Sequence, residues 1–122
     1  MSSPTQRTLK LLRDEGYTAQ VVERWCSFTK RRHDLFGIID VLAIKDGETL
    51  AVQTTSGSGV SARLKKMLAS ENLEKILRAG WQVHIHGWRK LKVKRGGKAM
   101  KWEVRLIDVR DENAFKKYSL PN

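Results

Sequence analysis

Two apolar runs joined by Asp46-Gly47 constrain the fold of this chain more than any other feature of the sequence. The first run covers residues 36–44 and is nearly continuous in β-branched and apolar side chains, and the second covers residues 49–55. Asp-Gly between two apolar runs is the strongest short-range signal for a β-hairpin with a two-residue turn. The first run is apolar on both faces, which is typical of a strand inside a sheet, so we predict that it lies centrally.

Further elements are predicted on both sides of this hairpin from apolar spacing and turn residues. In chain order they are a helix over residues 4–15, a strand over 17–25, a basic connection at 30–33, the hairpin, helical segments at 64–68 and 70–80, a strand over 81–88, and a strand over 98–109 that pairs across Gly96-Gly97 with the basic stretch from Arg89; the last dozen residues form a short helix or a loose tail. This order predicts an α/β fold with an αβββαβ core, a mixed sheet flanked by helices and a basic C-terminal β-hairpin extension. A chain of 122 residues suits a single domain over residues 1–122.

The net charge of the chain is strongly positive. Lysine and arginine number 24 against 13 aspartates and glutamates, which gives +11 at pH 7. Such an excess favours a polyanionic partner, for which nucleic acid is the first expectation. The alternatives are a solvated basic surface without a dedicated partner, or attraction to anionic lipid. Much of the excess lies between Arg89 and Arg105, where Glu103 is the only acid.

Cysteine content and hydropathy indicate the cellular compartment that we expect for this chain. Cys26 is the single cysteine, which excludes an intramolecular disulfide and a cysteine-based zinc cluster. No apolar stretch approaches the roughly 20 residues that a membrane span needs, and the N-terminal segment lacks the apolar core of a secretory signal. We therefore expect a cytoplasmic protein that does not span a membrane.

Polar side chains interrupt the two apolar runs at three positions. The two-residue turn places Asp40 opposite Gln53, with Cβ atoms about 5 Å apart, and Thr55 shares that face. A buried carboxylate is costly unless it finds a partner or a metal ion. Either Asp40 is solvated or bonded to a backbone amide near a strand end while Gln53 and Thr55 bond each other, or the three side chains form a functional site.

Residues 34–43 (DLFGIIDVLA), followed by residues 50–55 (LAVQTT), resemble the core of the PD-(D/E)XK nuclease superfamily. Small Holliday junction resolvase-like and VRR-NUC-like members are the most similar, and residues 72–81 also resemble their helix and following strand. The resemblance covers about residues 4–90 and leaves a basic hairpin and tail at about residues 89–122. It implies a restriction endonuclease-like core and a metal-dependent DNA endonuclease directed by DNA structure or ends.

The resemblance also implies roles for the polar residues of the hairpin. Asp40 corresponds to the metal-binding aspartate, Gln53 stands at an acidic position, and Thr55 stands at the position of a lysine that assists the attacking water. The amide oxygen of Gln53 and the backbone carbonyl of Thr54 could still contact one or two Mg²⁺ or Mn²⁺ ions, because such cations prefer oxygen ligands. Glu23 matches the first acidic motif of the superfamily, or else it is an exposed strand glutamate paired with a nearby arginine.

A replacement cation is needed at the position of Thr55. A hydroxyl cannot stabilise negative charge on a phosphate as an ammonium does. Arg63 and Lys66 are the candidates, because they lie three residues apart on the helix that follows, and we assign the role to Lys66. Alternatively, Arg63, Lys65 and Lys66 form only the exposed face of an amphipathic helix.

DNA contacts are predicted near the acidic motif and in the C-terminal hairpin. The Arg31-Arg32-His33 turn precedes Asp40 closely and would contact the DNA backbone, unless it is a solvated connection. Trp88 would stack on an unpaired base, unless it belongs to the core. The predicted DNA-binding residues are Arg31, Arg32, Arg63, Lys65, Trp88, Arg89, Lys90, Lys92, Lys94 and Arg95.

His84 and His86 alternate along a predicted strand, so both imidazoles project from one face. We expect this pair to face solvent. A zinc site needs a third ligand, and none lies nearby in the sequence, so we predict no metal site there.

Three functions remain open from the sequence. The first is a metal-dependent nuclease of the PD-(D/E)XK type. The second is a non-catalytic nucleic-acid-binding protein that keeps the nuclease sheet but has lost hydrolysis through Gln53 and Thr55. The third is a basic structural protein in which the polar strand positions are incidental. A resolvase would need to form a homodimer to cut a junction symmetrically, but no dimer interface can be identified from the sequence.

Overall fold

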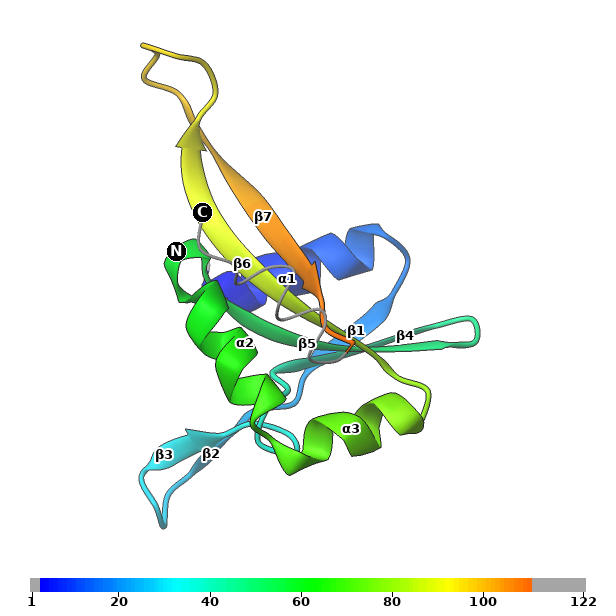
Figure 1. The fold of residues 1–122 in the computed structure, drawn as a ribbon. Coiled ribbons are helices and arrows are strands. Elements are labelled where there is room, and N and C mark those ends of the chain that lie inside the picture. Colours follow the sequence, from blue (N-terminus) through cyan, green and yellow to red (C-terminus); the bar gives the residue numbers. More distant parts are fainter. Residues whose placement is uncertain (1–2, 111–122) are drawn as a thin grey trace.

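A mixed five-stranded sheet lies at the centre of the structure, a computed structural model in which residues 3–110 are described (Figure 1). The strands follow the spatial order β1-β4-β5-β6-β7; β5 and β6 pair in parallel, and the other neighbours pair antiparallel. Their bounds are β1 (Thr18–Val21), β4 (Val41–Lys45), β5 (Glu48–Ser56), β6 (Gln82–Lys92) and β7 (Met100–Asp108). The predicted α/β class with a mixed sheet flanked by helices is confirmed.

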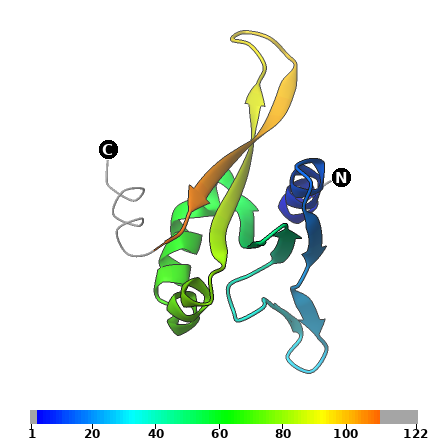
Figure 2. The ribbon, with the colours of Figure 1, turned by 90° about the vertical axis from the view of Figure 1, so that its right-hand side faces the viewer.

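Helices cover both faces of this sheet (Figure 2). They are α1 (Pro4–Asp14), α2 (Val60–Leu68) and α3 (Glu71–Arg78), with a short 3-10 turn, η1 (Gly57–Gly59), before α2. α1 packs Leu9 and Leu12 against one face, whereas α2 and α3 pack against the other. None of the helices in the described part of the chain is long and apolar enough to cross a membrane.

Side-chain caps fix where two of the predicted helices begin. The Ser3 hydroxyl accepts a hydrogen bond from the Gln6 amide at the start of α1, and the Ser70 hydroxyl accepts one from the Asn72 amide at the start of α3. Such caps satisfy amides that have no partner within the helix. Ser3 and Ser70 therefore mark the N-terminal ends of α1 and α3.

The Asp46-Gly47 turn between β4 and β5 is also confirmed. Lys45 pairs with Glu48 across it, and Gly47 has a φ of 72°, which is the left-handed conformation that a tight hairpin turn requires. The same register pairs Val41 with Val52. Asp40, one residue before β4, therefore meets Gln53, one residue further along β5, as the sequence predicts.

β4 is shorter than the predicted strand over residues 36–44. Leu35 and Ile39 form an isolated antiparallel bridge, and Phe36 and Gly37 adopt left-handed φ values of 54° and 81°. Ile38 and Ile39 of this segment are buried against α2 and α3, so they lie in a packed turn rather than in a strand. β4 is an inner strand with β1 and β5 on its two sides, which confirms its predicted position inside the sheet.

The predicted strand over residues 17–25 is divided between two sheets. β1 lies in the main sheet, whereas β2 (Arg24–Cys26) pairs with β3 (Arg31–His33) in a separate two-stranded sheet. The basic connection predicted at residues 30–33 is therefore largely a strand, because the chain reverses at residues 27–30. This β2–β3 hairpin projects from the body of the molecule (Figure 1).

The C-terminal hairpin consists of β6 and β7, which pair from His84 with Asp108 to Lys92 with Met100. β6 is longer than the predicted strand over residues 81–88, and beyond Trp88 it pairs with β7 alone. Figure 1 shows this part of β6 and β7 extending away from the helices as an arm. The helix or tail predicted for the last dozen residues lies outside the described residues.

Candidate metal centre and basic surface

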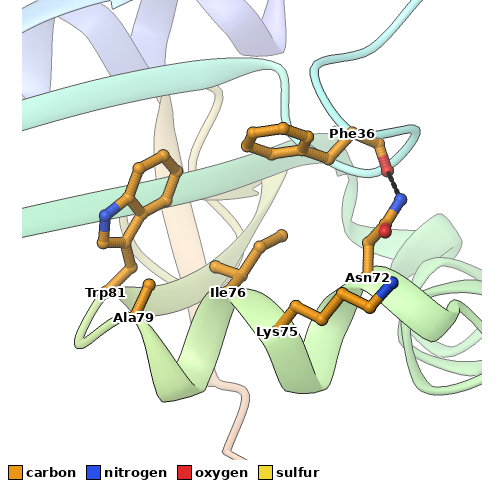
Figure 3. Close-up of a pocket in the computed structure, with 6 residues that line it drawn as sticks. All are labelled: Phe36, Asn72, Lys75, Ile76, Ala79 and Trp81. Carbon is orange, nitrogen blue, oxygen red and sulfur yellow. Dashed lines mark hydrogen bonds between the residues drawn. The ribbon is translucent and has the colours of Figure 1, made fainter.

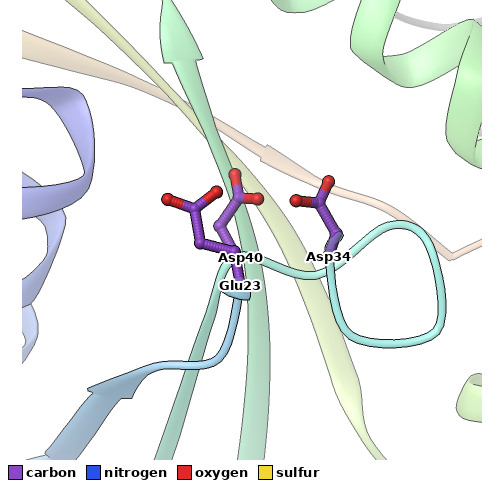
Figure 4. Close-up of side chains that lie close together, drawn as sticks. All are labelled: Glu23, Asp34 and Asp40. Carbon is purple, nitrogen blue, oxygen red and sulfur yellow. The ribbon is translucent and has the colours of Figure 1, made fainter. Parts of the chain in front are cut away.

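Three carboxylates converge beside the sheet (Figure 4). They belong to Glu23, between β1 and β2, to Asp34, just after β3, and to Asp40, just before β4. One carboxylate oxygen from each lies within 4.8 Å of the others. Glu23 and Asp34 are partly buried, and Asp40 is only 4% exposed. This acidic cluster could hold a metal ion.

Asp34 was not among the predicted metal ligands, although it opens the segment that carries the resemblance. A continuous strand would hold it about 20 Å from Asp40, since a strand advances about 3.3 Å per residue. In the structure, the bridge between Leu35 and Ile39 folds the chain back, so the residues that flank the bridge come together. Gly37, which adopts a left-handed φ, was the signal in the sequence for this turn. The strand-like composition of the residues around it concealed the turn.

The predicted contact between Asp40 and Gln53 is present. The Gln53 amide donates to Asp40 Oδ2 at 2.6 Å, and the backbone amide and hydroxyl of Thr54 donate to the same oxygen at 2.8 and 3.2 Å. None of these three bonds reaches the other carboxyl oxygen of Asp40. Gln53 is buried, and its Oε1 has no hydrogen-bond partner among the described residues. A buried acceptor without a protein partner is rare, so a water molecule or a metal ion is expected to contact it.

The Asp40 carboxyl binds its proton more tightly than an ordinary aspartate does. Burial raises its pKa to about 7, the Thr54 amide opposes this shift, and the neighbouring Asp34 carboxyl raises the pKa further. A cation within the acidic cluster would act in the opposite direction, because it favours the ionised carboxylates. Proton and metal therefore compete for the same group.

An open polar cavity of about 550 Å³ contains the acidic cluster. α1, the β2–β3 hairpin, the end of β5 and α2 each contribute to its wall, through Pro4, Thr5, Glu23, Arg32, Asp34, Asp40, Gln53, Thr54, Thr55, Ser56, Arg63 and Lys66. All four predicted catalytic residues, Asp40, Gln53, Thr55 and Lys66, therefore line one cavity. The four predicted metal ligands, Glu23, Asp40, Gln53 and Thr54, line it as well.

Two cations at the cavity contact its acids. Lys66 Nζ lies 3.9 Å from Asp34 Oδ2, and Arg32 Nη1 lies 3.0 Å from Glu23 Oε1. Glu23 thus has the arginine partner that the sequence offered as the alternative to a metal role, and it is also part of the acidic cluster. It lies in a connection and not in the predicted strand.

The other predicted DNA-binding cations are exposed but lie outside the cavity wall. Arg31 is on β3 and Lys65 is on α2. A further group is on or beyond the end of β6, namely Arg89, Lys90, Lys92, Lys94 and Arg95. Arg89 pairs with Glu103 on β7 at 3.2 Å.

Trp88 and the histidine pair do not face solvent, because α1 covers this part of the sheet. Trp88 is 9% exposed and donates from Nε1 to Thr8 Oγ1 at 2.9 Å, so its predicted stacking on a base is wrong and the core alternative holds. His86 is buried, with Nδ1 3.1 Å from the same hydroxyl, and burial lowers its pKa to about 4. His84 is partly buried, and burial lowers its pKa too, so the predicted solvent-facing pair is also wrong.

A second, apolar pocket of about 190 Å³ lies between α3 and the turn after Asp34 (Figure 3). Its walls include the rings of Phe36 and Trp81, whose centroids are 6.0 Å apart, and the Asn72 amide donates to the Phe36 carbonyl oxygen at 3.0 Å. This pocket contains no acidic side chain and none of the predicted site residues.

No protein-family model, curated protein or solved structure matches this chain. The fold and the site define it as an α/β protein with a mixed sheet and an acidic cluster that could hold a metal ion. Any more specific function rests on the chemistry of the residues described above.

Proposed function

We propose that this chain is a metal-dependent nuclease of the PD-(D/E)XK type that hydrolyses phosphodiester bonds in DNA. The observation that carries the proposal is the convergence of Glu23, Asp34 and Asp40 in a polar cavity that arginine and lysine side chains also line. Carboxylates bind the metal, and the cations attract the polyanionic substrate. The mixed sheet flanked by helices and the net charge of +11 are consistent with this activity.

The residues of the acidic cluster fit Mg²⁺ or Mn²⁺ better than a softer metal. The cluster offers oxygen ligands from three carboxylates, and the Oε1 atom of Gln53 is a buried acceptor that has no partner within the described part of the chain. Magnesium and manganese prefer such oxygen donors. One or two bound ions would polarise the scissile phosphate and lower the pKa of a water molecule.

Lys66 and Arg63 are proposed to supply the positive charge that the superfamily has from a lysine at the position of Thr55. Both line the cavity from α2, and the Lys66 ammonium already lies near an acid of the cluster. A positive charge held there would stabilise the negative charge that develops on the phosphate. Arg32 holds Glu23 by an ion pair and would orient this carboxylate toward the cluster.

The second candidate function is a non-catalytic nucleic-acid-binding protein on a degenerate nuclease fold. It is favoured by one observation, the hydrogen bond of the Gln53 amide to Asp40 where the superfamily has a second acid. Together with the raised pKa of Asp40, this bond weakens the electrostatic attraction for a metal near neutral pH. Such a protein would bind DNA through its basic surface without cutting it.

Cleavage of end-labelled linear, flapped and four-way-junction DNA in Mg²⁺ or Mn²⁺ separates the two functions. We expect metal-dependent cleavage by the wild-type protein and by Asp46→Asn, which exchanges one good turn residue for another. Asp40→Asn is expected to abolish cleavage, because it removes a charged ligand of the acidic cluster. Binding without cleavage of any substrate by the wild-type protein would favour the second function.

A further inference from the structure

The β2–β3 hairpin, whose Arg32 lines the metal cavity, exposes two aromatic side chains. Phe28 in its turn is 94% exposed and Trp25 on β2 is 60% exposed, which makes them the two most exposed large apolar side chains among the described residues. Burying an aromatic ring is a major source of folding energy, but Phe28 is almost fully exposed and Trp25 is mostly exposed. Their exposure favours a role in binding rather than in stability.

The charges around these rings define the kind of partner. Residues 24–33, which we call the aromatic hairpin, contain no acid and carry four cations, Arg24, Lys30, Arg31 and Arg32. A positively charged surface with exposed aromatic rings is the arrangement that proteins use to bind single-stranded nucleic acid, because bases stack on the rings and phosphates lie near the cations. A protein partner would instead need acidic side chains that also offer apolar surface.

The register of the aromatic hairpin links it to the acidic cluster. Trp25 pairs with Arg32 across the two strands, so their side chains lie on the same face. Arg32 in turn contacts Glu23 of the acidic cluster and lines the metal cavity. A DNA base that stacks on Trp25 therefore lies next to Arg32, and Arg32 contacts one of the residues proposed to cut the DNA.

We propose that the aromatic hairpin binds unpaired nucleotides and thereby directs single-stranded or branched DNA to the acidic cluster. This inference rests on the proposed nuclease function and names its substrate class. Bases inside a duplex already stack on their neighbours, whereas unpaired bases offer their faces to Phe28 and Trp25. The other exposed tryptophan near cations, Trp102, already has the Arg7 guanidinium 3.5 Å from its ring centroid.

The test is fluorescence anisotropy of a labelled oligo-dT and a labelled duplex of equal length, in EDTA so that metal-dependent cleavage cannot occur. Phe28→Leu and Trp25→Leu keep apolar side chains but remove the rings, and Phe28→Trp keeps a ring. We expect each leucine variant to lose at least about fivefold in affinity for oligo-dT, with little change for the duplex. Phe28→Trp is expected to bind like the wild type, and so is the control Ile44→Ala, which removes an exposed apolar side chain on β4 outside the metal cavity.

Unchanged affinity for oligo-dT in both leucine variants would overturn the inference, and so would an equal loss of affinity for the duplex. These outcomes are independent of catalysis, because the binding assay contains no metal. Absence of cleavage by the wild-type protein, together with ring-dependent binding of oligo-dT, would overturn the nuclease and leave the aromatic hairpin as a single-strand binding element.

Discussion

Asp40 unites the structural and the chemical requirements of the site. Three donors converge on one of its oxygens, and Asp34 lies close enough to raise the pKa of its carboxyl. The ordinary pKa of 3.8 applies in the unfolded chain, and about 7 applies in the fold. Because the folded state holds the proton more tightly, the stability from this group is complete below pH 3.8 and is lost as the pH rises through about 7.

Asp40→Asn is therefore expected to remove part of the pH dependence of stability. In EDTA, the free energy of unfolding of the wild-type protein should fall between pH 5 and pH 7 by at most about 1.4 kcal/mol per pH unit from this group. The uncharged variant should lack this contribution and should be the more stable protein at pH 8. Urea unfolding across this pH range measures both. Identical pH dependence in the two proteins would show that Asp40 remains ionised in the fold.

Lys66→Ala is expected to slow DNA cleavage at saturating substrate by about tenfold or more, because the variant removes a positive charge beside the acidic cluster. Lys75→Ala is the matched control, since Lys75 is exposed on α3 and lies outside the metal cavity. Quenched-flow or gel assays at saturating DNA measure the rate. Equal rates for the two variants would show that Lys66 is not the catalytic cation, and Arg63 would be the next residue to test.

The elements divide into those that local sequence determines and those that long-range packing determines. The turn at Asp46-Gly47 sets the β4–β5 register and thus the meeting of Asp40 with Gln53, and α1 follows from its apolar spacing and N-terminal cap. Residues 35–39 have strand-like composition but fold as a packed turn, because burial against α2 and α3 outweighs local preference. The position of Asp34 depends on that turn, so the third acid of the cluster was missed.

The exposure of aromatic residues was equally hard to predict. Trp88 lies among cations in the sequence, but α1 buries it, whereas Trp25 lies in an apolar run and is exposed on the β2–β3 hairpin. Which ring is buried depends on which element covers that part of the sheet. Neither composition nor alternation contains this information.

Gly87 allows α2 to approach the sheet. A methyl group on this glycine would overlap Val60 Cγ2 at the start of α2 and would contact the backbone of Gly57. We expect Gly87→Ala to lower the free energy of unfolding by about 1–3 kcal/mol through this overlap. In urea unfolding, the double variant with Val60→Ala should be less destabilised than the sum of the two single variants, since the smaller side chain makes room. An additive result would mean that α2 is not held at this distance by Gly87.

The molecule carries basic segments at opposite ends, the β2–β3 hairpin and the β6–β7 arm (Figure 1). The acidic cluster lies where the β2–β3 hairpin joins the main sheet (Figure 4). Cations that contact phosphates release counterions, so each contact increases the dependence of DNA affinity on salt. Replacing Lys92, Lys94 and Arg95 with alanine should lower the slope of log affinity against log salt for duplex DNA by about 2 to 3. Removing the same charge from Lys10, Lys75 and Arg78 should change the slope less. Equal slopes for the two triple variants would exclude the arm from the DNA-binding surface.

Titration of the protein with Mn²⁺ by calorimetry at pH 8 tests the acidic cluster most directly. Wild type and Asp46→Asn should bind one or two ions per chain, Asp34→Asn should bind at least about tenfold more weakly, and the wild-type affinity should fall as the pH drops below about 7, where Asp40 regains its proton. Absence of saturable binding, or equal binding by Asp34→Asn, would contradict a metal centre formed by Glu23, Asp34 and Asp40.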